Sequence, residues 1–226
     1  MLFRSYGEAY QYCLSLYRKN KSPALELSLG RIAFLENKDG IALQYLNPIA
    51  DSSLAAYSSV RGEALYYRGL VSQKQGRTEE AEKDWLRALE FQSSPRAEIQ
   101  YRLGKVYVDR QHYETAMPYL AEASRILENR LEVHTLLGAC CLQLSRFQEG
   151  VEVYSRCILL EPWEYDHYYN RGICLTEIGR FEESEKDFEV CLKLKPERLS
   201  AYVRMVDRKR TRLNSSHVSQ SRRPSS

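Results

Sequence analysis

Residues 168–196 contain the stretch that decides the fold, YYNRGICLTEIGRFEESEKDFEVCLKLKP. Apolar residues recur in it three and four positions apart on both sides of a turn at residues 179–180, which predicts two amphipathic helices. Gly172 lies in the first helix, and the small residue Ser184 follows twelve positions later in the second. The large residue Phe188 comes four positions after that. We expect the two small residues to let the helices approach closely and the large residue to fill the gap toward a next unit.

The same frame recurs along the chain with a period near 34 residues. Its glycines are Gly30, Gly69, Gly104, Gly138 and Gly172, and the small residues twelve positions later are Ala42, Ala81, Ala116, Gly150 and Ser184. The large residues four positions further on are Leu46, Trp85, Leu120, Tyr154 and Phe188. A single helix pair cannot bury its apolar face alone, whereas stacked pairs share a continuous core. The period therefore predicts an all-α solenoid.

The repeated frame resembles the tetratricopeptide repeat (TPR) family. Residues 168–175 and 179–185 match the first helix and the turn of that family closely, and the resemblance covers residues 6 to about 206. It implies an α-α superhelix, a right-handed solenoid of antiparallel helix pairs. Each pair then consists of a helix A, which lines the concave side, and a helix B.

The frame divides the chain into successive units. We assign residues 1–22 to a lone helix B, 23–61 to an irregular first repeat, 62–96 to the second, 97–130 to the third, 131–164 to the fourth, 165–198 to the fifth and 199–206 to the start of a truncated repeat. Pro48 predicts a kink or an early end of its helix, followed by an extended connection from Asp51. Pro118 is expected near the start of its helix, where proline is tolerated. Residues 145–148 form a candidate capping box.

The last residues, 207–226, differ from the rest in composition. Six of the 33 Lys and Arg lie there with one acid, so residues 1–206 are close to neutral and predict no attraction to nucleic acid. This stretch and residues 2–5 resemble translated sequencing-adapter read-through. We therefore expect a disordered, artefactual tail on a fragment of a longer repeat protein. The alternatives are an inert basic arm or an arm that binds acidic partners.

The sequence carries no recognisable catalytic or metal-binding motif. The six cysteines, Cys13, Cys140, Cys141, Cys157, Cys174 and Cys191, lack metal-ligand spacing. They are typical of small buried residues in a reducing compartment, which favours a cytoplasmic protein without a signal peptide. His134 takes a packing position, which favours a structural role. No apolar run reaches membrane-spanning length. We expect no enzyme activity, no cofactor and no metal.

The family resemblance implies a binding groove along the A helices. The twelve candidate partner-binding positions are Leu27, Arg31, Phe34, Tyr66, Leu70, Lys74, Tyr101, Lys105, Thr135, Ala139, Tyr169 and Ile173. Tyrosine and aliphatic side chains with sparse charge suit an extended peptide or a partner helix, with Arg31, Lys74 and Lys105 as charge readers. The alternative is that these tyrosines only pack along the superhelix.

One ligand class of the family is disfavoured. TPR domains that hold chaperone C-termini use a carboxylate clamp of Lys, Asn and Arg side chains on three A helices. Here Glu132 and Asp166 stand at expected Lys positions and would repel a carboxylate. Only Asn170 and Arg204 fit the last register.

The function predicted is a non-catalytic protein-protein interaction scaffold that binds a partner peptide or helix on the concave face. One alternative is the interaction domain of a larger enzyme whose catalytic domain lies outside this chain. Another is an architectural array that self-associates through uncapped apolar ends.

Overall fold

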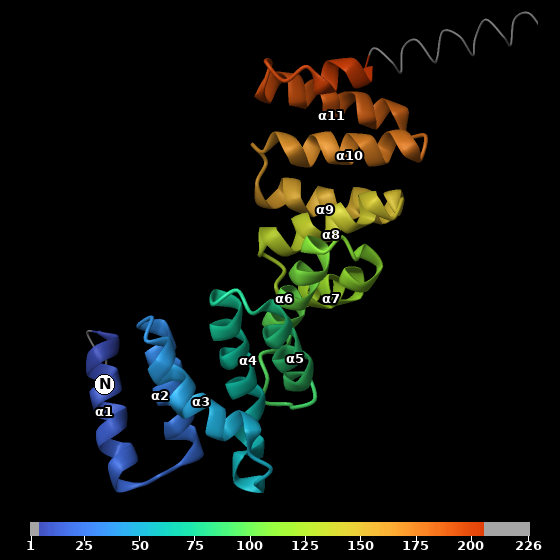
Figure 1. The fold of residues 1–226 in the computed structure, drawn as a ribbon. Coiled ribbons are helices and arrows are strands. Elements are labelled where there is room, and N and C mark those ends of the chain that lie inside the picture. The colour runs from blue at the N-terminus through green and yellow to red at the C-terminus, as the bar shows by residue number, and fades with distance from the viewer. Residues whose placement is uncertain (1–4, 206–226) are drawn as a thin grey trace, which may run out of the picture. The chain divides into compact units, whose positions relative to one another are not determined.

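The computed structural model describes residues 5–205 and divides the chain into two compact units, Met1–Gln111 and His112–Ser226 (Figure 1). The helices of unit 1 are α1 (Tyr6–Lys19), α2 (Pro23–Leu35), α3 (Asp39–Asp51), the short 3-10 helix η1 (Ala55–Tyr57), α4 (Ser58–Lys74), α5 (Thr78–Ala88) and α6 (Arg96–Asp109). Those of unit 2 are α7 (Tyr113–Ile126), α8 (Leu131–Gln143), α9 (Phe147–Leu160), α10 (Tyr165–Glu177) and α11 (Phe181–Leu194). Residues 200–205 are also helical. The described part of the chain contains no strand, which confirms the predicted all-α class.

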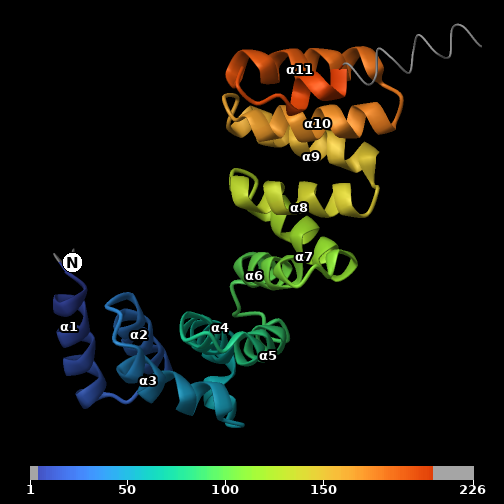
Figure 2. The ribbon, with the colours of Figure 1, turned by 45° about the horizontal axis from the view of Figure 1, so that its top comes forward.

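Neighbouring helices pack in pairs within each unit. In unit 1, α2 packs on α3 and α4 on α5, while α4 also contacts α2 and α3. In unit 2, α8 packs on α9 and α10 on α11, and α9 joins the two pairs. Figure 2 shows α8 to α11 stacked one after another within unit 2. The adjacent pairs are those that the 34-residue frame predicts.

In the first, second, fourth and fifth repeats, the glycine of the frame lies under the large side chain of the same repeat. A Cβ atom added at Gly172 would lie 2.8 Å from Cε1 of Phe188, and one at Gly138 would lie 2.7 Å from Cζ of Tyr154. Real Cβ atoms do not approach so closely, so only glycine lets helix A and helix B meet there. The predicted close approach is confirmed. The sequence expectation placed the large residue toward the next unit and did not include this contact within its own repeat.

Two repeats carry a charged pair where the others carry apolar side chains. Arg68 Nε and Nη2 donate to the two carboxylate oxygens of Asp84, each at 2.7 Å. Arg171 makes the same bidentate contact with Asp187, at 2.8 and 2.7 Å. The corresponding pairs in the other repeats are Leu29 with Tyr45, Leu103 with Tyr119 and Leu137 with Val153. The ion pair ties helix A to helix B in the second and fifth repeats.

The turn between the two helices of each repeat contains one residue in the left-handed region. These residues are Asn37, Gly76, Gln111, Ser145 and Gly179, with φ between 56° and 78°. The candidate capping box at residues 145–148 is therefore wrong. Ser145 has φ 56° and precedes the N-cap residue Arg146, which has no side-chain capping bond.

Both internal prolines lie inside helices. α3 continues three residues past Pro48 to Asp51, so the helix does not end at the proline, and the extended connection begins at Ser52, one residue later than predicted. Pro118 is the sixth residue of α7 rather than part of its first turn, so the expectation of an easily tolerated position is wrong. The tail at residues 207–226 and residues 2–4 lie outside the described residues.

Candidate functional site

The twelve predicted partner-binding positions, which we call the A-helix face, lie on α2, α4 and α6 in unit 1 and on α8 and α10 in unit 2. Four of those in unit 1 are buried, with exposed fractions of 5 to 8%: Leu27, Tyr66, Leu70 and Tyr101. The backbone carbonyl of Tyr66 also accepts a hydrogen bond from Trp85 Nε1 at 3.2 Å. Buried rings have little area left for a partner, so Tyr66 and Tyr101 serve the packing of unit 1.

A cluster of partly buried aromatic side chains in unit 1 surrounds Tyr67, which the sequence analysis did not select. Tyr67 is half-buried, and the rings of Phe34 and Tyr66 meet it edge-on at 5.7 and 5.2 Å between centroids. The guanidinium of Arg31 lies 5.5 Å from the centroid of the Tyr67 ring. Arg31 also pairs with Glu63, at 2.9 Å between Nη1 and Oε1. This arrangement is an aromatic cluster whose nearest cation already has an internal partner.

The two lysines on this face differ in their surroundings. Lys74 Nζ donates to Asp39 Oδ1 at 2.9 Å and to Asn37 Oδ1 at 3.0 Å, which ties α4 to the turn between α2 and α3. Lys105 is exposed and forms no ion pair with any residue that the structure describes. Among Arg31, Lys74 and Lys105, Lys105 is therefore the one that a partner's acidic side chain could approach without displacing a carboxylate of the described residues.

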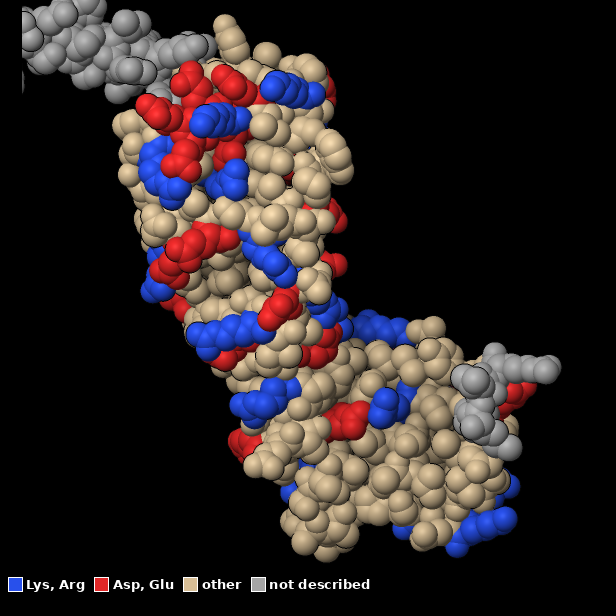
Figure 3. Space-filling view, turned by 180° about the vertical axis from the view of Figure 1, so that it is seen from behind, with Lys and Arg blue, Asp and Glu red and all other residues tan. Residues whose placement is uncertain are grey.

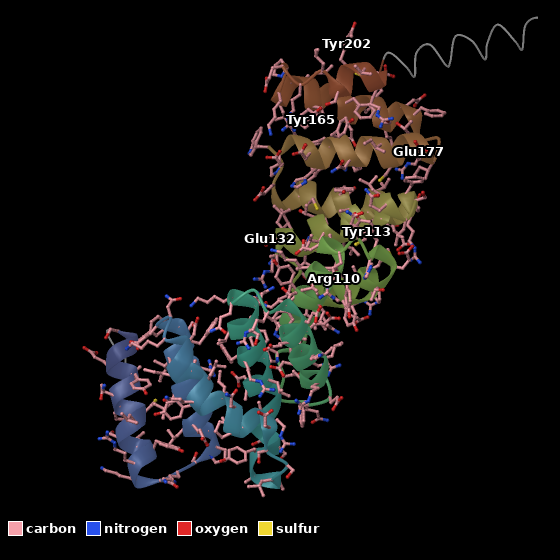
Figure 4. The ribbon with its side chains drawn as sticks, in the orientation of Figure 1. Arg110, Tyr113, Glu132, Tyr165, Glu177 and Tyr202 are labelled. Carbon is pink, nitrogen blue, oxygen red and sulfur yellow. The ribbon has the colours of Figure 1, made fainter. Side chains whose placement is uncertain are left out.

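The A-helix face of unit 2 is uncharged at its four predicted positions. Thr135 on α8 is exposed, and Ala139 on α8 with Tyr169 and Ile173 on α10 are half-buried. The two ends of α10 are marked by Tyr165 and Glu177 in Figure 4. In contrast to unit 1, these side chains keep part of their apolar surface open to solvent.

Tyr169 is held in place by its neighbours. Its ring stacks on Tyr165 at 5.7 Å with an interplanar angle of 18° and lies 6.0 Å from the ring of Phe188. Tyr165, the first residue of α10, is itself buried, and its hydroxyl lies 2.9 Å from Oγ of Ser200 at the start of the helical residues 200–205. The stack fixes the orientation of the Tyr169 ring, so it needs little further ordering on binding a partner.

Two ion pairs lie at the start of α10. Lys195 Nζ donates to Glu164 Oε1 at 3.0 Å, and this hydrogen bond lowers the pKa of Glu164. Arg198 Nη1 donates to Asp166 Oδ1 at 2.9 Å, and its guanidinium lies 5.0 Å from the centroid of the Tyr165 ring. Figure 3 shows charged side chains of both signs spread over the visible face of unit 2 and a broad uncharged area on that of unit 1.

Five cysteines and His134, residue types that can be reactive, lie in buried, packed positions. Five cysteines are buried and Cys13 is half-buried. Burial raises the pKa of Cys157 to about 11 and that of Cys141 to about 12, so these thiols stay protonated near neutral pH. His134 is buried, with Nε2 2.9 Å from the carbonyl oxygen of Glu128, as its predicted structural role requires.

Within residues 5–205, no group of three or more His, Cys, Asp or Glu side chains is placed to hold a metal ion. No helix in this range combines the length and the apolar character that crossing a bilayer requires.

Models of known protein families match three stretches of the sequence. Tetratricopeptide repeat models match residues 40–98 and 165–198, and a model of anaphase-promoting complex, cyclosome, subunit 3 matches residues 74–157. No curated protein matches the sequence significantly.

Several solved structures share the fold. YrrB, described as a TPR protein with an unusual peptide-binding site, is 20% identical with a TM-score of 0.69, covering 85% of this chain and 97% of its own. MamA of strain AMB-1 is 19% identical with a TM-score of 0.63, covering 77% and 92%. MamA from Desulfovibrio magneticus RS-1 is 18% identical with a TM-score of 0.57, covering 79% and 97%. At these identities the likeness shows the fold alone.

Proposed function

The chain is a tetratricopeptide-repeat protein, and from this premise we propose that it captures a peptide or helix of a partner protein on its A-helix face without catalysing a reaction. The family and the fold support the broader role of a protein-interaction scaffold. YrrB, which has this fold, is described as having a peptide-binding site, and this is in keeping with the proposal.

The observation that carries the proposal is the partly open, uncharged group of four predicted positions on the A-helix face of unit 2. Ala139, Tyr169 and Ile173 are half-buried, and Thr135 beside them is exposed. Apolar side chains of a partner would cover this area and lose contact with water, which is the main favourable term in such binding. The stacked ring of Tyr169 offers area at low entropic cost together with one polar hydroxyl.

In unit 1 we assign a different contribution to the same face. An acidic side chain of a partner could pair with Arg31 only by displacing Glu63, and with Lys74 only by displacing Asp39. Lys105 carries no such cost and is the charge reader that we favour. Tyr67, with Phe34 and Arg31 around it, replaces the buried Tyr66 as the aromatic contact that we assign to this unit.

A second candidate, self-association, rests on one observation. Leu199, Tyr202 and Val203 have exposed fractions of 66, 56 and 52% on the last described helical turns, where Figure 4 marks Tyr202. Exposed apolar side chains in one patch favour contact with a second copy. Light scattering over a concentration series would test this, and a Tyr202→Glu variant that behaves like the wild type would exclude this patch.

The proposal is tested with a random peptide library displayed on phage and selected on the whole chain. The affinity of a selected peptide is then measured for Ala139→Arg, which places a long charged side chain on the A-helix face of unit 2. Ala121→Arg is the matched control, because Ala121 is also half-buried but lies on helix B of the third repeat, α7. We expect a roughly tenfold weaker Kd with Ala139→Arg only. Peptides that bind Ala139→Arg as tightly as the wild type would contradict the proposal for unit 2.

A further inference from the structure

A hollow of about 580 Å³ lies in unit 1 between α3 and α5. It shares no residue with the A-helix face. Each wall contributes two side chains four positions apart, which places them on one side of their helix. These are Leu43 and Asn47 from α3 and Lys83 and Arg87 from α5. We call this hollow the α3–α5 groove.

The floor of the groove is the ion pair of the second repeat. Arg68 binds Asp84 through two hydrogen bonds of 2.7 Å and reaches Asp51 Oδ1 at 2.7 Å through Nη1. Arg68 and Asp84 neutralise each other, whereas the Asp51 carboxylate, whose side chain is 61% exposed, leaves this end of the floor with a net negative charge. Attraction for an acidic ligand therefore comes from the rim of the groove and not from its floor.

The rim of the groove keeps two cations without a partner. Arg77 is paired with Glu80 at its end of the groove. Lys83 and Arg87 are exposed, and neither forms an ion pair with any residue in the described part of the chain. They stand one helical turn apart on α5, about 6 Å along the axis. Unpaired charges of one sign at a hollow attract a ligand of opposite charge.

Apolar side chains stand beside these cations. Leu86 is 38% exposed and Leu43 is half-buried. A continuous nucleic-acid backbone fits this site poorly, because its phosphates would extend beyond the two cations to Glu79, Glu80 and Glu82 on the preceding turns of α5, whereas a short peptide needs to reach only Lys83 and Arg87. A short segment with both acidic and apolar side chains matches the charge and the apolar surface together.

We propose that the α3–α5 groove docks an acidic peptide segment of a partner protein. Two Asp or Glu side chains about one helical turn apart would pair with Lys83 and Arg87, and a leucine-type side chain between them would cover Leu43 and Leu86. The walls of this groove are formed by the B helices α3 and α5, its floor includes Arg68 of α4, and it shares no residue with the A-helix face.

The fifth repeat provides an internal comparison. It has the same Arg-Asp pair, Arg171 with Asp187, and the same Arg-Glu pair at the turn, Arg180 with Glu183. Its floor differs in one contact, because Arg171 Nη1 donates to Ser155 Oγ where Arg68 Nη1 donates to Asp51. Lys186 corresponds there to Lys83, but Val190 replaces Arg87 and Glu189 replaces Leu86. The region between α9 and α11 thus lacks the second cation and gains an acid, so we expect it not to hold an acidic peptide.

The test uses a fluorescein-labelled peptide in which two Glu residues at positions i and i+4 flank a leucine, titrated against the whole chain by fluorescence anisotropy. The groove variant is Lys83→Glu with Arg87→Glu. The control, Lys186→Glu with Lys193→Glu, changes the net charge equally at exposed positions of α11. We expect a Kd at least about tenfold weaker for the groove variant and within about twofold of wild type for the control. Both variants should keep the wild-type circular dichroism spectrum.

Four further measurements decide the nature of the site. A counterpart peptide with Gln in place of both Glu should bind at least about tenfold more weakly, and added salt should weaken the Glu peptide, since the two cations are exposed. Ala139→Arg should leave this affinity unchanged, so failure of the A-helix proposal does not affect this one. Equal binding of the Gln peptide, equal losses in both charge variants, or full displacement of the peptide by a short DNA duplex at equimolar concentration would each overturn the proposal.

Discussion

The second and fifth repeats share their internal contacts and differ in what they present to solvent. Both have an Arg-Asp pair, an aromatic ring over a helix A glycine and a glycine with φ 78° at the turn. Outside this frame, α5 carries Leu86 and Arg87 where α11 carries Glu189 and Val190. On helix A, Tyr66 and Leu70 are buried, whereas Tyr169 and Ile173 are half-exposed. The comparison teaches that the frame fixes the helix pair and leaves the surface free to take on a separate binding chemistry in each repeat.

The largest expected effect comes from breaking the ion pair of the second repeat. Arg68→Leu leaves the carboxylate of Asp84, whose side chain is 10% exposed, without its bidentate partner. Loss of one partner of a buried pair costs about 3 kcal/mol. Adding Asp84→Tyr recreates the Leu-Tyr pair of the third repeat and should recover most of that loss. Urea unfolding monitored by circular dichroism measures both. A double variant no more stable than Arg68→Leu would show that the repeats are not interchangeable at this pair.

A smaller effect is expected at the turn between helix A and helix B. Gly179→Ala places a Cβ atom at φ 78° and should cost roughly 1 kcal/mol, whereas Ser145→Gly in the fourth repeat relieves φ 56° and should gain up to about 1 kcal/mol. The urea midpoint should therefore move in opposite directions. Gly40→Ala is the control, because a Cβ atom there meets nothing within 4 Å and the helix favours alanine. Shifts of the same sign at Gly179 and Ser145 would contradict the left-handed turn.

A further expected effect is a loss of stability at alkaline pH. Burial raises the pKa of Cys141 to about 12 and that of Cys174 to about 11, whereas an unfolded cysteine has a pKa near 8.5. A raised folded-state pKa means that the stabilisation is complete below pH ~8.5 and is lost as pH rises toward 11 to 12. The urea midpoint should fall between pH 8 and 10, and Cys141→Ala with Cys174→Ala should reduce that fall. If the urea midpoint of this variant fell as much as that of the wild type, ionisable groups other than Cys141 and Cys174 would be the cause of the fall.

Much of the fold could be predicted from the sequence because the frame depends on residue size. A Cβ atom at the glycine beneath Tyr154 or Phe188 would force the ring to shift, so the spacing of glycines and large residues locates the helix pairs. The site was harder to predict. Arg31 and Glu63, or Lys74 and Asp39, lie far apart in the sequence and meet only after consecutive pairs stack. The side chains of adjacent helical residues point in directions about 100° apart. Tyr66 is therefore buried, whereas its neighbour Tyr67 is half-buried.

The α3–α5 groove escaped the sequence analysis for the same reason. Lys83 and Arg87 resemble ordinary solvated residues of an amphipathic helix until α3 is seen to place Leu43 and Asn47 opposite them. Ser145 was misassigned because a serine before a helix commonly caps it. Here it occupies the left-handed turn position that glycine holds in the second and fifth repeats.

The central claim, that frame and surface are separable, is tested most directly by measuring two quantities on two variants of the second repeat. Gly69→Ala forces a Cβ atom against the buried ring of Trp85, and Lys83→Glu with Arg87→Glu changes only exposed charges. The urea midpoint and the Kd for the acidic peptide are measured for each. We predict that Gly69→Ala lowers the midpoint with Kd within about twofold of wild type, and that the charge variant weakens Kd about tenfold with an unchanged midpoint. Parallel loss of stability and affinity in either variant would contradict the account.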